Sequence, residues 1–369
     1  MSKRSGAHVE TYAHVRQLPQ DALALMAQAE QRHIECGADW FANLVDAVYA
    51  CEPQAHQVRI HVLRRDERVL AVLPVVLQTG ALGREISALS NYYTAIYAPA
   101  LAADASAEDL QPLMRELRHA AAGAAVYRFS PMDPASREFG VLKRALSLAG
   151  LSTHGYFAFG NWYEPVQQDW DGYLKSRSSK MRNTIKRMGK KFEQEGGRLE
   201  IVQGGERLEA AIAAYQSVYA HSWKNAEPYP AFVPGLCALS ARRGWLRLGI
   251  AWLNDVPTAA QLWIVAHGRA NIVKVAYDER YKALTSGTLV TALLMQHALD
   301  VDRVTEVDYL IGDDPYKATW MSQRRERFGL VAYDPRTLRG LLGMARQALG
   351  ELRRRLKPRD AARPENPAA

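Results

Sequence analysis

The sequence predicts an α+β fold made of two similar halves, and two observations lead to this expectation. In the second half, three strand-like runs are separated by short turns at residues 254–255 and 267–269, which is typical of an antiparallel meander. An amphipathic helix and one more strand then follow. The elements expected in the second half lie at residues 245–253, 258–265, 271–277, 287–301 and 306–311.

A shorter version of the same order occurs in the first half. Residues 58–63 alternate between apolar and polar, whereas residues 69–77 are almost wholly apolar, so a hairpin with one exposed and one buried strand is predicted. Pro74 within the second run predicts a bulge or an edge position. A helix at residues 106–122 and a strand at residues 125–129 complete the parallel, which indicates a duplicated α+β unit.

The remaining segments are predicted from their local patterns. Residues 90–98, SNYYTAIYA, are aromatic and favour a strand. Further helices are expected at residues 21–36, 40–48, 134–149, 177–195, 206–221, 231–243 and 335–356, and further strands at residues 199–202 and 330–333. The tail after Lys357 is rich in Pro, Arg and Ala and is predicted to be disordered. We therefore divide the chain into residues 1–155, residues 156–345 and a terminal region, residues 346–369.

The composition argues against several classes of protein. Of the 369 residues, 48% are hydrophobic and 23% are charged, which is ordinary for a globular chain of two domains. The longest apolar run, residues 69–77, is far shorter than a membrane span, and the N-terminus lacks the apolar core of a signal peptide. Three scattered cysteines form no CxxC pair, and no two of the ten histidines lie four residues apart. We therefore expect a cytoplasmic location, no transmembrane segment and no metal site.

The net charge of +8 is concentrated in one segment. Residues 175–191 contain eight Lys and Arg residues and no acid, so the rest of the chain is neutral. Such a segment has two interpretations. It is either the solvated face of a helix or a surface for an acidic partner, such as a polyanionic substrate, a nucleic acid or the phosphates of a cofactor.

The most informative stretch leads from the strand at residues 271–277 through Thr285, Ser286 and Gly287 into the amphipathic helix. A small polar turn that opens a helix leaves backbone N–H groups without partners, and the helix dipole adds positive potential there. These groups favour an anion, and a pyrophosphate suits them. The alternative is that Ser286 only caps the helix.

A second polar group follows the last strand of this unit and comprises Asp308, Gly312, Asp313, Asp314, Pro315, Tyr316 and Lys317. A carboxylate or tyrosine beside a bound amine can remove its proton as the amine attacks a thioester, and Tyr316 can instead return a proton to the leaving thiolate. The alternative is a capped loop in which Asp314 precedes a helix and Lys317 is solvated. Five aromatic residues either line an acceptor pocket or fill the core: Tyr92, Tyr93, Trp162, Trp223 and Tyr229.

Three motifs, in this order along the chain, resemble one enzyme family. They are Ser222-Trp223-Lys224, the Ser286-Gly287-Thr288 turn, and Asp308 followed by Gly312-Asp313-Asp314-Pro315-Tyr316-Lys317 and Trp320. Their order and spacing resemble the GNAT-type N-acyltransferases of the cellulose-biosynthesis (CelD/BcsL-like) branch, which is related to the FemAB peptidyltransferases. The start of the basic helix at Arg182 resembles the same family. Of the phosphate loop of standard GNAT enzymes, the turn keeps only Ser286-Gly287.

The resemblance implies two tandem GNAT-like lobes, each a mixed, mostly antiparallel sheet flanked by helices, with the active site in the second lobe. It also implies acetyl-CoA or another acyl-CoA as co-substrate. The residues expected to bind this donor are Val275, Ala276, Tyr277, Ser286, Gly287 and Thr288. The residues expected to act in catalysis are Asp308, Tyr316 and Lys317, and those expected to contact the substrate are Trp223, Lys224 and Arg182.

We therefore expect an acyl-CoA-dependent N-acyltransferase, in the simplest case an acetyltransferase. Its acceptor would be an amine of a small molecule or of an envelope or polysaccharide precursor. Two alternatives stay open. One is a FemAB-like transferase that takes an aminoacyl group from tRNA, with the basic segment contacting phosphates. The other is a non-catalytic GNAT scaffold that binds a polyanion.

Overall fold

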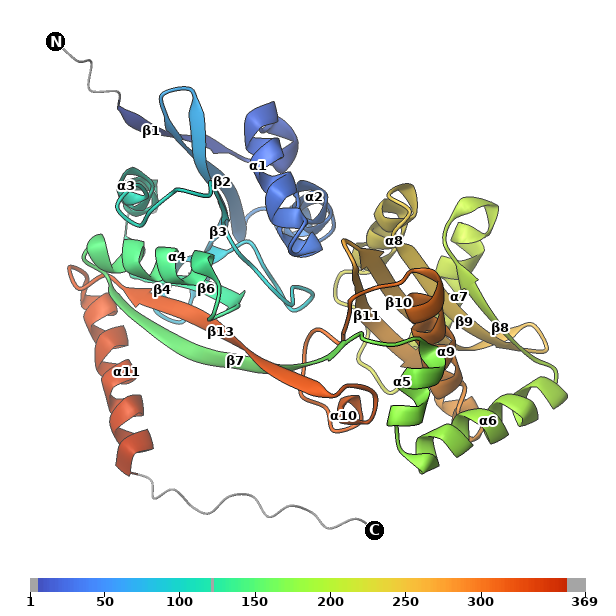
Figure 1. The fold of residues 1–369 in the computed structure, drawn as a ribbon. Helices are drawn as coiled ribbons and strands as arrows, with labels where there is room; N and C mark the ends of the chain where they lie inside the picture. Colours follow the sequence, from blue (N-terminus) through green and yellow to red (C-terminus); the bar gives the residue numbers. More distant parts are fainter. Residues whose placement is uncertain (1–5, 121–122, 357–369) are drawn as a thin grey trace.

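The computed structural model describes residues 6–120 and 123–356, and within these ranges the strands form one continuous mixed sheet (Figure 1). The strand order is β1-β2-β3-β4-β6-β13-β7-β12-β11-β10-β9-β8, and the short β5 (Ala100–Leu101) pairs with β3. Two neighbouring pairs in this order run parallel, namely β4 with β6 and β11 with β12. The other neighbours are antiparallel, so the expected α+β class with a mostly antiparallel sheet is confirmed.

Two runs of the chain pass through the same series of elements. The first run consists of β1 (Ala7–Tyr12), α1 (Gln20–Glu30), α2 (Ala38–Ala47), β2 (His56–Arg65), β3 (Arg68–Gly80), β4 (Gly83–Ala88), α3 (Gln111–Ala120), β6 (Val126–Met132), α4 (Arg137–Leu148) and β7 (Ser152–Pro165). The second consists of β8 (Gly197–Val202), α7 (Leu208–Ala220), α8 (Phe232–Arg242), β9 (Leu246–Leu253), β10 (Val256–Ala266), β11 (Arg269–Tyr277), α9 (Ser286–Gln296), β12 (Glu306–Asp308), α10 (Lys317–Trp320) and β13 (Gln323–Tyr333). The duplicated unit expected from the sequence is therefore present.

The last strands of the two runs are exchanged. β7 lies beside β12 of the second run, and β13 lies beside β6 of the first. β7 and β13 also pair with each other, and Figure 1 shows this long pair running from one lobe to the other. The lobes are therefore interlocked. The division at residues 155 and 345 stays a prediction. Its first boundary falls inside β7, and the expected disordered tail lies outside the described residues.

Helices cover both faces of the sheet in the second lobe. α7 and α8 pack on one face and share a core with the helices of the first lobe. On the other face lie α9 and the two connecting helices, α5 (Trp170–Ser176) and α6 (Ser179–Gln194) (Figure 1). Trp263 of β10 is fully buried in this second core. The chain ends in α11 (Leu338–Leu356), which follows β13.

Two local predictions are wrong. The helix expected at residues 21–36 ends at Glu30, and a separate 3-10 turn, η2 (Ile34–Cys36), follows it. The strand expected at residues 90–98 is an irregular segment. Its fully buried Tyr97 donates its hydroxyl to the carbonyl of Pro74 at 2.8 Å and its N–H to the carbonyl of Pro131 at 2.6 Å. The segment therefore fills the space between strands instead of extending the sheet.

Candidate active site

A cavity opens where β11 and β12 diverge. β12 pairs with β11 only at Arg269, Ala270 and Asn271, and the rest of β11 pairs with β10 alone. The gap beside the unpaired edge leads to a cavity of about 580 Å³. All six residues predicted to bind an acyl-CoA line it: Val275, Ala276, Tyr277, Ser286, Gly287 and Thr288.

The turn before α9 forms one end of this cavity. Thr285 has a φ of 58°, which is left-handed, and this residue reverses the chain so that α9 begins at Ser286. The side chain of Ser286 is buried and lies 3.5 Å from the carbonyl of Thr258, and no side-chain cap is formed at this helix start. Because amides in the first turn lack acceptors within the helix, the N–H groups of Ser286 and Gly287 are available to a ligand.

Gly287 brings the helix start against the ring of Tyr277. A Cβ atom added at this position would lie 3.4 Å from Cδ1 of Tyr277, which is a tight contact. Gln261 of β10 stabilises the turn. Its Nε2 donates to the carbonyl of Gly287 at 2.9 Å and to Oγ1 of Thr291 at 2.7 Å. A larger residue at position 287 would therefore occupy space beside Tyr277 at the cavity wall.

Tyr316 and Trp223 line this cavity and also a second one of about 270 Å³, so the two cavities meet at these residues. Tyr309, Asp314 and Val275 also line both cavities. The ring of Tyr316 lies edge-on to Tyr309 at 5.8 Å, and the ring of Trp223 lies 4.5 Å from that of Tyr277. These side chains mark the junction of the two cavities.

Two titratable groups here have shifted pKa values. Burial raises the pKa of Tyr316 to about 12, with a smaller contribution from the charge of Asp314, so its hydroxyl stays protonated at neutral pH. Burial, assisted by the charge of Lys274, lowers the pKa of Lys224 to about 8. Within the described residues the Lys224 amine has no hydrogen bond or ion pair, and it lies 5.5 Å from the Trp223 ring. The amine is therefore free to engage a ligand.

The wall of the second cavity comes from both lobes. The carboxylate of Glu227 accepts hydrogen bonds from the hydroxyls of Tyr92 and Tyr93 at 2.5 Å each and pairs with Nζ of Lys274 at 2.5 Å. The sequence did not point to Glu227, Lys274 or Gln261 as site residues. A signal was present for two of them, because Lys274 and Gln261 are polar residues inside apolar strands, and such residues need a partner.

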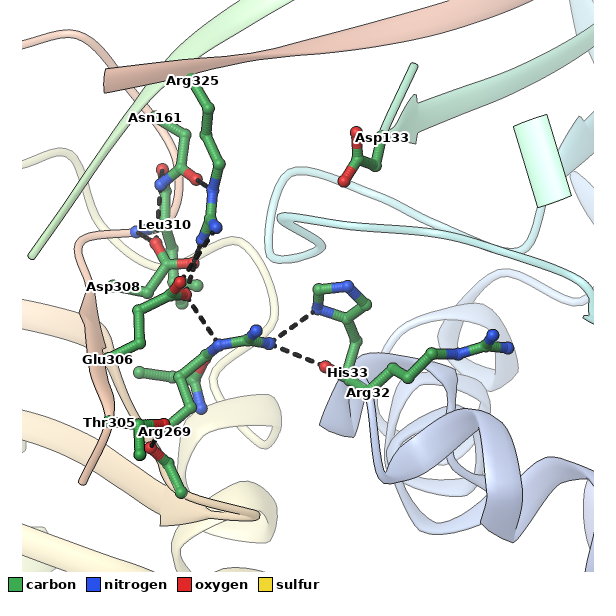
Figure 2. A network of polar contacts seen from close by, with 12 residues as sticks. Arg32, His33, Asp133, Asn161, Arg269, Thr305, Glu306, Asp308, Leu310 and Arg325 are labelled. Atoms are coloured by element: carbon green, nitrogen blue, oxygen red, sulfur yellow. Dashed lines mark hydrogen bonds and ion pairs between the residues drawn. The ribbon is translucent and has the colours of Figure 1, made fainter. Parts of the chain in front are cut away.

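Asp308 does not line the large cavity. Its carboxylate accepts from Nδ2 of Asn161 at 2.6 Å and from the backbone N–H of Leu310 at 2.7 Å, and it pairs with Arg325 at 2.5 Å (Figure 2). Burial alone would raise the pKa of Asp308, but Arg325 and these hydrogen bonds hold it below its usual range. Figure 2 shows that Arg325 also bonds Glu306, so the network joins β7, β12 and β13.

Of the three other predicted residues outside this cavity, Lys224, Lys317 and Arg182, the last two also contact the chain. Lys317 lines the second cavity, is only 4% exposed, and donates to the carbonyls of Ile311 and Gly312. Arg182 donates to the carbonyls of Lys175, in the last turn of α5, and of Arg177, which follows this helix, and it lines neither cavity.

The basic segment forms the exposed side of α5 and α6. Five of its cations are exposed and make no ion pair with the described residues: Lys175, Lys180, Lys186, Arg187 and Lys190. α6 packs against α9 and against η5 (Glu279–Leu284), the turn that leads into α9. The positive surface therefore borders the same helix whose first turn ends the large cavity.

Among residues 6–120 and 123–356, no group of three or more His, Cys, Asp or Glu side chains is placed to hold a metal ion. No helix in the described part of the chain has the length and apolar character of a membrane span.

The comparisons with known proteins agree with this geometry. Residues 179–318 match the family model described as an acetyltransferase (GNAT) domain. This range contains the turn at Ser286 and the loop with Tyr316. No curated protein matches the chain in sequence.

Several solved structures share the fold. FemX is 13% identical with a TM-score of 0.57, and the match covers 93% of this chain and 99% of FemX. A tandem GNAT protein from the clavulanic acid biosynthesis pathway is 12% identical with a TM-score of 0.51, covering 88% of this chain and 98% of that one. The C-terminal DUF2156 domain of an Agrobacterium fabrum protein described as a candidate lysylphosphatidylglycerol synthetase is 14% identical, with a TM-score of 0.51 and coverage of 89% and 96%.

At these identities the structural likeness shows the fold alone. It supports the tandem arrangement of two GNAT-like lobes, and the family match supplies the class of chemistry for residues 179–318. Residues 179–318 are therefore similar to a GNAT acetyltransferase domain within a tandem α+β fold, and a domain of this kind implies a transferase enzyme.

Proposed function

We propose that the chain is an acyl-CoA-dependent N-acyltransferase, in the simplest case an acetyltransferase. One observation carries this proposal. The cavity in the β11–β12 gap is lined by a helix start with free amides and by Tyr316, which also lines a second cavity that adjoins the first. This order matches the order of groups in the reaction, namely donor phosphates, thioester and acceptor amine.

In this proposal the donor lies along the first cavity. The amides of Ser286 and Gly287 bind the pyrophosphate, helped by the positive end of the α9 dipole. Thr288 lines the same cavity, and its own N–H donates to the carbonyl of Thr285. The backbone from Val275 to Tyr277 pairs with β10 on one side only, so its other edge is free to hydrogen-bond the arm that carries the thioester. The thioester carbonyl then lies near Tyr316.

The acceptor amine attacks the thioester carbonyl from the second cavity. Neutral Lys224 takes the proton that the amine loses as the C–N bond forms, which its lowered pKa favours. The tetrahedral intermediate then breaks its C–S bond, and the hydroxyl of Tyr316 donates a proton to the leaving thiolate. The products are the amide and free CoA, and the lysine returns its proton to solvent while Tyr316 regains one.

The remaining predicted residues have supporting roles in this proposal. Asp308 holds β12 against Asn161 and Arg325, and Lys317 holds the loop at residues 311–314 through its carbonyl contacts. Both are therefore positioning residues for Tyr316. Arg182 ties α6 to the end of α5.

The second cavity supports an amine acceptor that has polar groups. Its wall combines the rings of Tyr92, Tyr93 and Trp223 with the amines of Lys224 and Lys274. Aromatic rings and cations suit sugars, amino acids and their phosphates. We infer an acceptor of a small-molecule, envelope or polysaccharide-precursor type, as in the CelD/BcsL-like branch, and a cytoplasmic location where acyl-CoA is present.

The proposal is tested by calorimetric titration of the full chain with acetyl-CoA. Gly287→Trp places an indole at the cavity wall beside Tyr277 and should weaken binding by at least about a hundredfold, the loss of roughly 3 kcal/mol. Gly287→Ala adds only one methyl group at a 3.4 Å contact and is the matched control. Equal affinity in both variants, with unfolding unchanged, would refute the donor assignment.

A second candidate function is a FemAB-like transferase that takes an aminoacyl group from tRNA. The five exposed and unpaired cations of α5 and α6 favour it, because phosphate contacts give strong, salt-dependent binding to nucleic acid. A gel-shift assay with tRNA at low salt separates the two functions. If the wild type binds tRNA and the variant Lys186→Gln/Arg187→Gln/Lys190→Gln does not, the second function is supported. If the wild type gives no gel shift, the second function is excluded.

A further inference from the structure

α11 carries a row of exposed leucines. Leu338, Leu341, Leu342, Leu349 and Leu352 are 86%, 47%, 46%, 55% and 51% exposed. They recur at spacings that place them on one face of a helix with 3.6 residues per turn. Single exposed leucines are ordinary, but five on one face of one helix form an apolar strip, which marks an interaction surface. We call these five residues the leucine strip.

The opposite face of α11 is the one that contacts the body. Gly343 lies against β13 and the β3–β4 turn, since a Cβ atom there would lie 2.4 Å from Tyr333 and 3.1 Å from Leu82. Met344 packs with the same residues. The leucine strip therefore points away from the sheet. Figure 1 shows α11 leaving the end of β13 as a separate rod.

Three arginines follow one edge of the leucine strip. Arg339, Arg346 and Arg353 are spaced seven residues apart and are exposed. Within the described ranges none of them forms an ion pair. An apolar strip with a row of unpaired cations beside it is complementary to a lipid surface, in which anionic headgroups cover apolar acyl chains.

We propose that α11 docks the protein on a membrane surface that contains anionic phospholipids. The leucine strip enters the boundary between headgroups and acyl chains, and the arginines lie at the level of the lipid phosphates. The helix lies in the plane of the membrane and does not cross it. The docked face is opposite to the face that holds α11 on the body, so docking leaves the contacts of Gly343 and Met344 intact.

A second copy of the chain fits this face less well. If two α11 helices paired through the leucine strip, an antiparallel pair would place the arginine rows of the copies against each other, and a parallel pair would offer those rows no acid. The terminal residues 357–369 contain only alanine and proline as apolar residues, so they cannot fill the strip either.

The experiment is co-sedimentation of the full chain with vesicles of three parts phosphatidylcholine to one part phosphatidylglycerol, compared with pure phosphatidylcholine. The wild type should prefer the anionic vesicles by at least about tenfold, since each arginine near such a surface contributes roughly fivefold. Leu342→Gln/Leu349→Gln should reduce partitioning by about a hundredfold, because each buried leucine contributes about tenfold. Arg339→Gln/Arg346→Gln/Arg353→Gln should lose the preference for anionic lipid.

Leu148→Gln is the matched control, because Leu148 is 47% exposed on α4 and lies outside the strip. It should bind vesicles like the wild type. Glutamine favours helix, so far-UV circular dichroism of each variant should be unchanged. The proposal is overturned if the wild type binds neither vesicle, or if the strip variant binds as well as the wild type. It is also overturned if light scattering shows a dimer that the strip variant disrupts without any effect of lipid.

Discussion

The two lobes share one topology but use the gap between their fourth and fifth strands in opposite ways. In the second lobe β11 leaves β12 after Asn271, and the gap opens into a cavity of about 580 Å³. In the first lobe β4 leaves β6 after Ser87, and residues 89–98 fold back into the gap. Tyr97 fills it, with its ring 6.3 Å from that of Phe129. One gap is open and the other is filled.

The difference comes from the connection between the fourth strand and the next helix. In the second lobe residues 278–285 form this connection, and it is short enough to place the start of α9 at the gap. In the first lobe residues 89–110 form it, and the extra chain occupies the gap and carries Tyr92 and Tyr93 to the second cavity. The second lobe thus provides the 580 Å³ cavity, and the first lobe provides part of the wall of the second cavity that adjoins it.

The largest expected effect is on stability, and it compares a substitution in the filled gap with one in the open gap. Tyr97→Ala should lower the free energy of unfolding by about 3–5 kcal/mol, because it empties a fully buried site and removes the hydrogen bond to Pro74. Tyr277→Ala, on the wall of the open cavity, should cost about 1 kcal/mol or less. Guanidinium denaturation measures both values. Similar losses in the two variants would contradict the comparison.

A second stability test compares two aspartates of the second lobe, Asp308 and Asp314. Asp308→Asn should cost about 3 kcal/mol, because it removes the buried carboxylate and leaves the half-buried Arg325 with only Glu306 as a charged partner. Asp314→Asn, at the rim of both cavities, should stay within about 0.5 kcal/mol of the wild type. Urea denaturation measures the free energy of unfolding of both variants. A large loss in Asp308→Asn supports a structural role for Asp308, and a loss as small as that of Asp314→Asn would contradict that role.

The next effect is catalytic and concerns the junction of the two cavities. Tyr316→Phe should lower kcat by about a hundredfold while acetyl-CoA affinity is unchanged, because only the proton for the leaving thiolate is lost. Release of free CoA thiol with an acceptor amine measures the rate. Tyr309→Phe keeps a ring beside Tyr316 and serves as the control, with near wild-type turnover. If both variants are equally active, Tyr316 has no acid role.

The smallest expected effect concerns the lysine of the second cavity. Lys224 acts as a base only when neutral, so kcat/KM of the wild type should rise as the pH increases through about 8, the lowered pKa of this group. Lys224→Met should lose that rise and about tenfold in rate at high pH. Lys282→Met, which lines the donor cavity, should keep the rise. A rise that survives in Lys224→Met would assign it to the acceptor amine instead.

Local sequence patterns were sufficient for the parts of the fold that depend on neighbours along the chain. The meander β9-β10-β11, the helix α9 and the turn at Ser286 all follow from periodicity and turn composition, which act over a few residues. The predicted amphipathic character of α9 is wrong, because within Ser286–Gln296 only Gln296 is exposed. The six residues from Val275 to Thr288 that were predicted to bind a donor line one cavity for the same reason, since they lie in one strand, one turn and one helix start. Their role in binding a donor stays a prediction. Residues 90–98 were mistaken for a strand because their side chains alone favour one.

By itself, then, the sequence determined the order of the elements, the duplication and the helix start that can hold an anion. Only the tertiary structure decided that β7 and β13 exchange places and that Asp308 forms an ion pair with Arg325. It also decided that Tyr92 and Tyr93 donate hydrogen bonds to Glu227 in the other lobe. The physical reason is the range of the interactions. Hydrophobic periodicity is encoded within one turn or one strand, whereas ion pairs and strand neighbours form between residues that only the complete fold brings together.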